Sequence, residues 1–180
     1  MKGTFLYDFV DVIKNCSYSN TYKMAWAKSL LEIALEDEWH THHPITISLE
    51  TMAKNILKYY WNHTYFFNLI QGSNPNKPPE IIRIARKLIT AYQNAYNTFY
   101  PERFERVTHK LKTLPEYNQQ LKRVVKTLKQ DVSYRFLYLN KRVLPMYQYE
   151  KKSNTFTIEP AHLKQLKNHA YMLFDIINYR

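Results

Sequence analysis

Hydrophobic residues recur every three or four positions along most of this chain, which is the spacing of one buried face of an α-helix. The pattern continues through Tyr96 and Phe99 in the fourth of these stretches, and through Phe174 and Ile177 in the last. It predicts helices over residues 5–13, 21–36, 49–71, 79–99, 102–112, 115–130 and 160–180.

The hydrophobic period changes from Ser133 onward, where apolar and polar residues alternate and β-branched and aromatic residues are frequent. This alternation predicts strands, with a hairpin turn at residues 151–154. A short β-branched run at residues 45–48 predicts a further brief strand. The sequence therefore indicates a mainly α fold, a multi-helix bundle with a small antiparallel β element near the C-terminal third. We expect a helical domain over residues 1–132 and a β-hairpin plus final helix over residues 133–180, packed as one continuous domain.

Glycine and proline mark the middle of the chain. Gly72 is expected to end the third helix, Pro75 and Asn76 to shape a loop, and Pro78 and Pro79 to start the next helix. The apolar spacing of the last helix continues to the final residues without a Gly or Pro to end it, so we expect this chain to be one piece of a longer protein.

Composition excludes several kinds of site. Two glycines in 180 residues exclude a glycine-rich nucleotide-binding loop. The single cysteine, Cys16, excludes an internal disulfide and a cysteine-based zinc site, and nothing around it indicates a reactive thiol. No signal peptide is evident and no apolar run approaches membrane-spanning length, so we expect a cytoplasmic protein with no membrane partner.

The formal net charge is +11 and it is unevenly distributed. Residues 1–90 carry 10 Lys and Arg against 8 Asp and Glu, whereas residues 91–180 carry 16 against 7. Such a field favours a polyanionic partner, with nucleic acid as the first candidate and an acidic protein or anionic membrane behind it.

The strongest candidate surface is the polar side of the helix over residues 115–130. Lys122, Lys126 and Lys129 recur at i, i+4 and i+7, and no acidic residue occurs between positions 121 and 130. A row of cations fits the phosphates of a duplex, whereas the alternative is a solvated helix face, which usually mixes charges of both signs. The DNA-binding candidates are Lys122, Arg123, Lys126, Lys129, Arg135, Lys141 and Arg142, with Asn76 and Lys77 in the loop.

Several segments resemble, in order, the N-terminal region of bacterial HNH-type endonucleases, a group associated with restriction and phage defence. They are NTYKMAWAKSLLEIA, ITISLETMAKNILKYYW, FFNLIQGSNPNKPPEI, RFLYLNK, LPMYQYEKKSNTFTIEPAHLKQLKNH and YMLFDIINYR. The resemblance covers most of residues 20–180. It implies the recognition or accessory part of a nuclease, with a divalent-metal nuclease module expected after the last helix. No His-Asn-His arrangement can be assembled within residues 1–180.

Other residues carry weaker signals. His40, His42 and His43 beside three acidic residues could bind a metal, or form a solvated loop. Asp131, Glu150 and Lys152 loosely match a second nuclease class, or a charged hairpin tip. Aromatic residues before Gly72 could stack on bases, but core packing is expected for them, with Tyr59 the first exception; they are Tyr59, Trp61, Phe66 and Phe67.

Two principal functions remain open from the sequence. The first is double-stranded DNA binding by the N-terminal module of an HNH-type, restriction-like endonuclease, through a basic face. The alternative is a protein-interaction or dimerisation module that positions or regulates a nuclease, and a homodimer is compatible with either. A third hypothesis, an autonomous metal-dependent nuclease, rests on Asp131, Glu150 and Lys152. No catalytic residue and no cofactor is assigned to this region.

Overall fold

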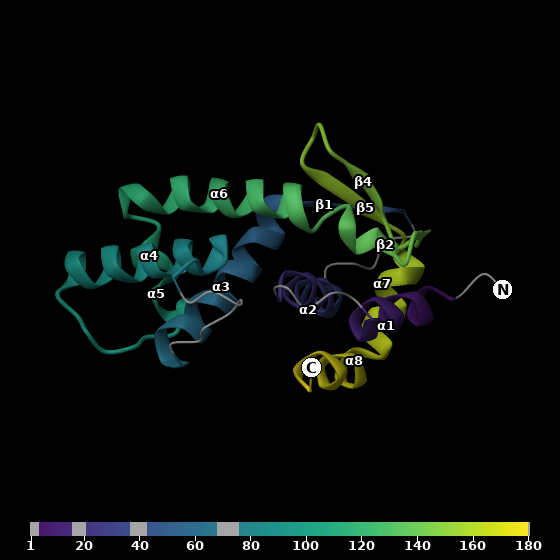
Figure 1. The fold of residues 1–180 in the computed structure, drawn as a ribbon, viewed down its shortest axis with the longest axis horizontal. Helices are drawn as coiled ribbons and strands as arrows, with labels where there is room; N and C mark the ends of the chain where they lie inside the picture. The colour runs from purple at the N-terminus through teal and green to yellow at the C-terminus, as the bar shows by residue number, and fades with distance from the viewer. Residues whose placement is uncertain (1–3, 16–20, 37–42, 68–75, 180) are drawn as a thin grey trace. The chain divides into compact units, whose positions relative to one another are not determined.

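The computed structural model describes residues 4–15, 21–36, 43–67 and 76–179. These residues form a mainly helical fold with a small antiparallel sheet, which confirms the predicted fold class. The helices are α1 (Phe5–Asn15), α2 (Tyr22–Leu35), α3 (Leu49–Phe67), α4 (Glu80–Tyr96), α5 (Phe104–Leu111), α6 (Pro115–Asp131), α7 (Pro160–Asn168) and α8 (Ala170–Asn178) (Figure 1). The strands are β1 (Ile45–Ser48), β2 (Tyr138–Leu139), β3 (Arg142–Val143), β4 (Gln148–Glu150) and β5 (Thr155–Ile158).

The chain divides into two compact units. Unit 1 comprises Met1–Met52 and Lys129–Arg180, and unit 2 comprises Ala53–Leu128. Helices α3 and α6 each run from one unit into the other. Because β1 pairs with β5, the two ends of the chain belong to the same unit. This division differs from the boundary at residue 132 that the sequence suggested.

The sheet of unit 1 has the strand order β1-β5-β4, with both pairings antiparallel. The β4–β5 hairpin has its turn at the expected position, and Asn154 takes the left-handed backbone conformation there, with φ 55°. Behind the sheet lies an aromatic core in which the Phe156 ring is 4.8 Å from Tyr147 and 5.4 Å from Trp26. The predicted hairpin and the brief strand at residues 45–48 are both confirmed.

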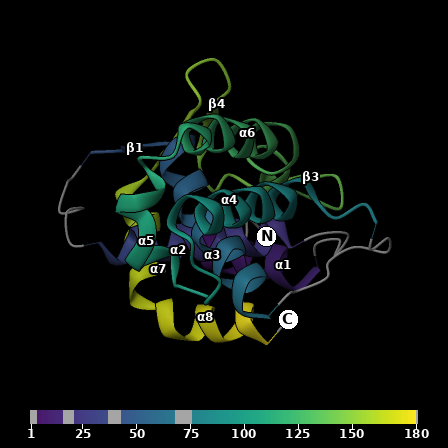
Figure 2. The ribbon, with the colours of Figure 1, turned by 90° about the vertical axis from the view of Figure 1, so that its left-hand side faces the viewer.

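The predicted single final helix is wrong. The chain bends at His169, whose backbone has φ −114° and ψ 12°, so α7 and α8 meet at an angle (Figure 2). Both helices contact α2, and each buries its own leucine, Leu166 in α7 and Leu173 in α8. The bend thus lets two short helices pack on one partner.

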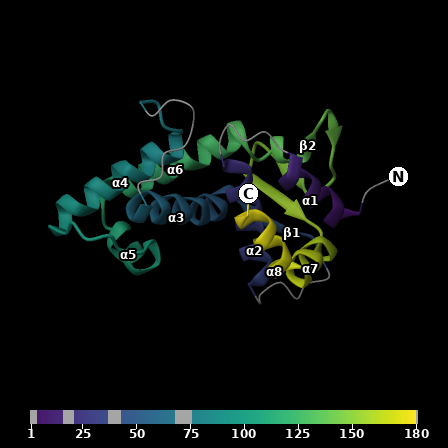
Figure 3. The same ribbon diagram turned by 60° about the horizontal axis from the view of Figure 1, so that its bottom comes forward.

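Unit 2 is helical, and its parts of α3 and α6 lie side by side with α4 (Figure 3). Trp61 of α3 is fully buried at its centre, with its ring 5.8 Å from Tyr92 of α4 and 5.9 Å from Phe104 of α5. The Trp61 Nε1 also donates a hydrogen bond of 2.8 Å to the Glu102 carbonyl. This pairing satisfies the indole N–H inside an apolar core.

Some aromatic residues expected in the core are exposed. Helix α4 ends at Tyr96, because Asn97 is left-handed with φ 47°, so Phe99 lies outside the helix and in solvent. Phe66 and Phe67 occupy the last turn of α3 and are also exposed, whereas Trp61 is buried as predicted. The apolar spacing of the sequence thus continues beyond the residues at which these helices stop packing against the core.

Candidate nucleic-acid interface

The exposed side of α6 carries Lys122 and Lys126, one helical turn apart. The opposite side buries Leu121, Val124 and Leu128, so core packing turns both ammonium groups outward. Neither lysine forms an ion pair or hydrogen bond with any residue that the structure describes. We call this pair the basic face of α6.

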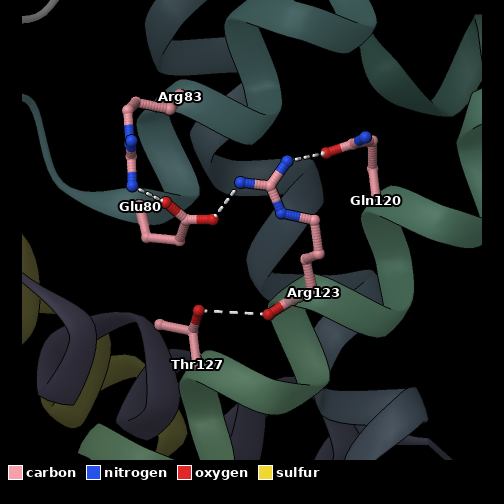
Figure 4. A network of polar contacts seen from close by, with 5 residues as sticks. All are labelled: Glu80, Arg83, Gln120, Arg123 and Thr127. Atoms are coloured by element: carbon pink, nitrogen blue, oxygen red, sulfur yellow. Dashed lines mark hydrogen bonds and ion pairs between the residues drawn. The ribbon is translucent and has the colours of Figure 1, made fainter.

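Arg123 has a different environment from its lysine neighbours. Its guanidinium donates to Glu80 of α4 at 2.5 Å and to Gln120 at 3.1 Å (Figure 4). The same Glu80 carboxylate also pairs with Arg83. Glu80 therefore joins α4 to α6 and neutralises part of the charge of two arginines, while the Arg123 side chain remains 42% exposed.

Lys129 and Arg135 belong to unit 1 and both have partners. The Lys129 ammonium donates to the Asn154 side chain at 2.8 Å, which ties the end of α6 to the β4–β5 turn. The Arg135 Nε donates to the Tyr134 hydroxyl at 2.9 Å, and its guanidinium lies 4.0 Å from Asp131. Both cations are structurally engaged, although each is partly exposed.

Lys141 and Arg142 both lie in the β2–β3 hairpin, but their surroundings differ. Asn140 and Lys141 form a two-residue turn in which both have positive φ, 49° and 67°, and this turn presents Lys141 to solvent. Arg142 instead forms ion pairs with Asp8 at 2.8 Å and Asp11 at 3.3 Å, both on α1. Asp8 is buried, so Arg142 is the counterion of a buried carboxylate.

The loop residues Asn76 and Lys77 are both exposed ahead of α4. The sequence had not marked α4 itself as a binding surface, yet it presents Arg83 and Lys87 to solvent, with Arg86 half-buried beside them. These cations do not stand out in the sequence, because the first 90 residues carry 8 Asp and Glu against 10 Lys and Arg.

Counted by contact unit, the charge is far more concentrated. Unit 2 contains 13 Lys and Arg against 4 Asp and Glu, a net charge of +9, and unit 1 has 13 against 11, a net charge of +2. Two of the four carboxylates of unit 2 accept hydrogen bonds from neutral groups: Glu102 from Tyr92 at 2.6 Å, and Glu105 from Asn62 at 3.4 Å. The positive potential is therefore centred on unit 2.

Within the described ranges of the chain, the other candidates for metal binding or nuclease chemistry do not come together as a site. His40, His42 and Cys16 lie outside the described residues, and His43 is exposed. Glu150 accepts the backbone N–H of Lys152 at 3.0 Å within the hairpin turn. Among the described residues, no three His, Cys, Asp or Glu side chains are grouped so that they could hold a metal ion.

The part of the chain that the structure describes contains no helix long and apolar enough to cross a membrane. No curated protein and no solved structure matches this chain. One family does match, over residues 6–173, which is most of the chain and includes both units. The chain belongs to that family, which is described as a domain of unknown function, DUF8808.

Proposed function

We propose that this protein binds double-stranded DNA through the basic face of α6. The observation that carries the proposal is that Lys122 and Lys126 stand exposed, without a partner among the described residues, in a unit of net charge +9. Cations that already have carboxylate partners add little to phosphate binding, because the partner must first be displaced. Unpaired lysines instead release counterions from the DNA when they bind.

Three further groups extend this surface within unit 2, and two of them, Arg83 and Arg123, contribute less than an unpaired lysine because both pair with Glu80. Arg123 lies beside the lysines on α6, and its guanidinium forms an ion pair with Glu80. Arg83 and Lys87 are exposed on α4, which Glu80 links to α6. These contacts are to phosphates, so they support affinity and orientation rather than base reading.

The narrower part of the proposal concerns the parent protein. We propose that the chain is the recognition module of an HNH-type, restriction-like endonuclease that acts in the cytoplasm, where DNA is accessible. The support is the sequence resemblance over most of residues 20–180. Metal-dependent cleavage would belong to a module other than the one described, so this chain is expected to bind DNA without cutting it.

The test compares two charge-matched double variants by fluorescence anisotropy with a labelled blunt duplex of mixed sequence. One variant is Lys122→Gln with Lys126→Gln, and the control is Lys151→Gln with Lys152→Gln at the β4–β5 turn of unit 1. Both remove two positive charges, so any difference between them reports local contact rather than net charge.

We expect the α6 variant to bind duplex at least tenfold more weakly than the wild type, and the hairpin variant to stay within about twofold. The affinity falls as salt rises, and each lost phosphate contact makes the slope of log K against log salt less negative by roughly 0.9. The slope of the α6 variant should therefore be less negative by nearly two. Equal effects of the two variants, or no duplex binding by the wild type at about 50 mM salt, would overturn the proposal.

A second candidate function, a protein-interaction module, is favoured by one feature of unit 1. Helix α8 exposes Tyr171 and Met172, and Tyr179, the residue that follows the helix, is exposed as well; the two tyrosines are each 89% exposed. Large exposed apolar and aromatic side chains grouped on and next to one short helix suit an apolar partner. This interaction would change little with salt, and replacing both tyrosines by serine would abolish it without affecting duplex binding.

A further inference from the structure

The loop between α4 and α5, residues 97–103, holds two adjacent aromatic side chains in solvent. Phe99 is 75% exposed and Tyr100 is 82% exposed. Single exposed aromatic residues are common on protein surfaces, but neighbouring ones form an apolar patch that usually has a partner. We call residues 97–103 the aromatic loop.

The aromatic loop is anchored to unit 2 on both sides of these rings. Left-handed Asn97 ends α4, and the hydroxyl of Tyr65 holds the Tyr100 carbonyl. The anchoring hydrogen bonds are Thr98 N to Gln93 O at 3.3 Å, Tyr65 hydroxyl to Tyr100 O at 3.0 Å, Trp61 Nε1 to Glu102 O at 2.8 Å, Tyr92 hydroxyl to Glu102 Oε1 at 2.6 Å, and Phe104 N to Asn62 Oδ1 at 2.9 Å.

These anchors have a consequence for binding. Pro101 further restricts the backbone of Tyr100, because the residue before a proline is disfavoured in the helical region. The backbone beneath both rings is thus fixed before any ligand arrives. A ligand that stacks on the rings loses little of its binding free energy to ordering of the protein.

Two arginines follow the rings in the chain, Arg103 at the end of the aromatic loop and Arg106 in α5. Arg103 is the residue that precedes α5, with an extended backbone, and Arg106 lies in the first turn of that helix. Both are exposed, and neither side chain forms an ion pair or hydrogen bond with the described residues. The aromatic loop and the first turn of α5 therefore carry two exposed aromatic rings and two unpaired guanidinium groups.

We propose that the aromatic loop binds single-stranded nucleic acid, with the rings of Phe99 and Tyr100 stacking on unpaired bases and Arg103 and Arg106 contacting the phosphates. Base–aromatic stacking beside a cationic groove is the general mode of single-strand binding and requires no particular base sequence. This site is additional to the basic face of α6 and goes beyond the duplex binding proposed above.

Charge argues against the other occupants of such a patch. A second copy of the chain would bring another unit of net charge +9 against the first, and the two would repel each other. The centres of protein–protein interfaces are depleted in charged residues, whereas two unpaired arginines adjoin these rings. A polyanion with flat apolar faces satisfies both features.

The test uses the full chain and short single-stranded probes, oligo(dT) and oligo(U), each with a central 2-aminopurine whose fluorescence reports stacking. One variant is Phe99→Leu with Tyr100→Leu, which keeps apolar area but removes the rings. The conservative variant is Phe99→Tyr with Tyr100→Phe, which keeps both rings. A control, Tyr7→Leu with Tyr138→Leu, removes two exposed rings from unit 1.

We expect the leucine variant to bind the probes at least tenfold more weakly and to lose the 2-aminopurine signal, since stacking contributes roughly tenfold or more per base. The conservative variant and the unit 1 control should behave like the wild type. Comparable affinity for both probes indicates that the site accepts either DNA or RNA. A preference for one probe indicates which of the two nucleic acids the site binds.

Unchanged probe binding in the leucine variant, with circular dichroism showing it folded, would overturn the proposal. So would a concentration-dependent increase in mass by light scattering that disappears in the same variant, because the loop would then be a dimer contact. Duplex binding is measured separately in each variant. Loss of duplex binding in Lys122→Gln with Lys126→Gln, together with retained 2-aminopurine signal, keeps the two sites distinguishable.

Discussion

Arg142 and Lys141 adjoin in the chain, yet their surroundings give them different roles. Lys141 stands in solvent at a hairpin turn, whereas Arg142 reaches the buried carboxylate of Asp8 on α1. A carboxylate taken out of water needs a close cation, since its desolvation is otherwise uncompensated. Of the two, Lys141 therefore remains a candidate for phosphate contact and Arg142 is a structural counterion.

The substitution Arg142→Ala tests this assignment. It leaves Asp8 buried without its closest cation, so the free energy of unfolding should fall by about 2 kcal/mol. That figure is below the range for fully buried pairs because the Arg142 side chain is itself about half exposed. Urea denaturation followed by circular dichroism measures the change, and duplex affinity of the folded variant should equal that of the wild type.

Lys141→Ala is the adjacent control and should leave the urea midpoint unchanged. If Arg142→Ala instead weakened duplex binding while unfolding at the wild-type urea concentration, the arginine would be a DNA contact after all.

At the scale of elements, the most consequential junction is the one between β1 and α3. Ser48 is the last residue of β1, opposite Thr155 of β5, and its hydroxyl accepts the backbone N–H of Thr51 at 3.1 Å. One residue thus ends a strand and caps a helix. The cap satisfies one of the backbone N–H groups that the first turn of a helix leaves without a partner.

Ser48→Ala should lower the free energy of unfolding by about 1 kcal/mol, because the alanine side chain cannot accept that hydrogen bond. Ser48→Thr keeps the hydroxyl and suits a strand, so it should recover most of the lost stability. Differential scanning calorimetry of the three proteins checks the order. A melting temperature of Ser48→Thr as low as that of Ser48→Ala would mean that packing, rather than the cap, explains the loss.

The elements also show what the sequence could and could not predict. Most helices could be predicted from the sequence because apolar spacing and proline positions are local features. The end of α4 was misplaced by three residues because Tyr96 and Phe99 continue the apolar spacing, while the left-handed Asn97 stops the helix. The pairing of β1 with β5 joins residues far apart in the chain, and no local pattern specifies that partner.

At the scale of the whole molecule, electrostatics depends on which segments fold together. Helices α4 and α6 are separated in sequence by a loop and a short helix, yet the Glu80–Arg123 pair joins them in unit 2. The candidate cations were all visible as charges in the sequence. Their partners were not, because Asp8, Glu80 and Asn154 come from distant segments. Partnering, rather than charge, separates Lys122 and Lys126 from the candidate cations that have partners, which are Arg123, Lys129, Arg135 and Arg142.

Buried tyrosines make the stability of both units sensitive to alkaline pH. Burial, together with the hydrogen bond to the Glu102 carboxylate, raises the pKa of Tyr92 in unit 2 far above its ordinary value near 10. Burial also raises the pKa of Tyr147 in unit 1. A raised folded-state pKa favours the native state fully below the unfolded pKa, and this stability is lost as the pH rises through the range above 10.

We therefore expect a urea midpoint that is flat up to about pH 9 and falls steeply beyond pH 10, because the unfolded chain then releases phenolic protons that the folded chain retains. Each such group steepens the fall by at most about 1.4 kcal/mol per pH unit. Circular dichroism and phenolate absorbance in one titration measure unfolding and ionisation together. Tyr92→Phe removes one of these groups, so its midpoint should fall less steeply with pH, even though its stability near pH 8 is lower. A variant with the wild-type steepness would show that Tyr92 ionises equally well in the folded protein, and that its hydrogen bond to Glu102 does not hold the proton in place.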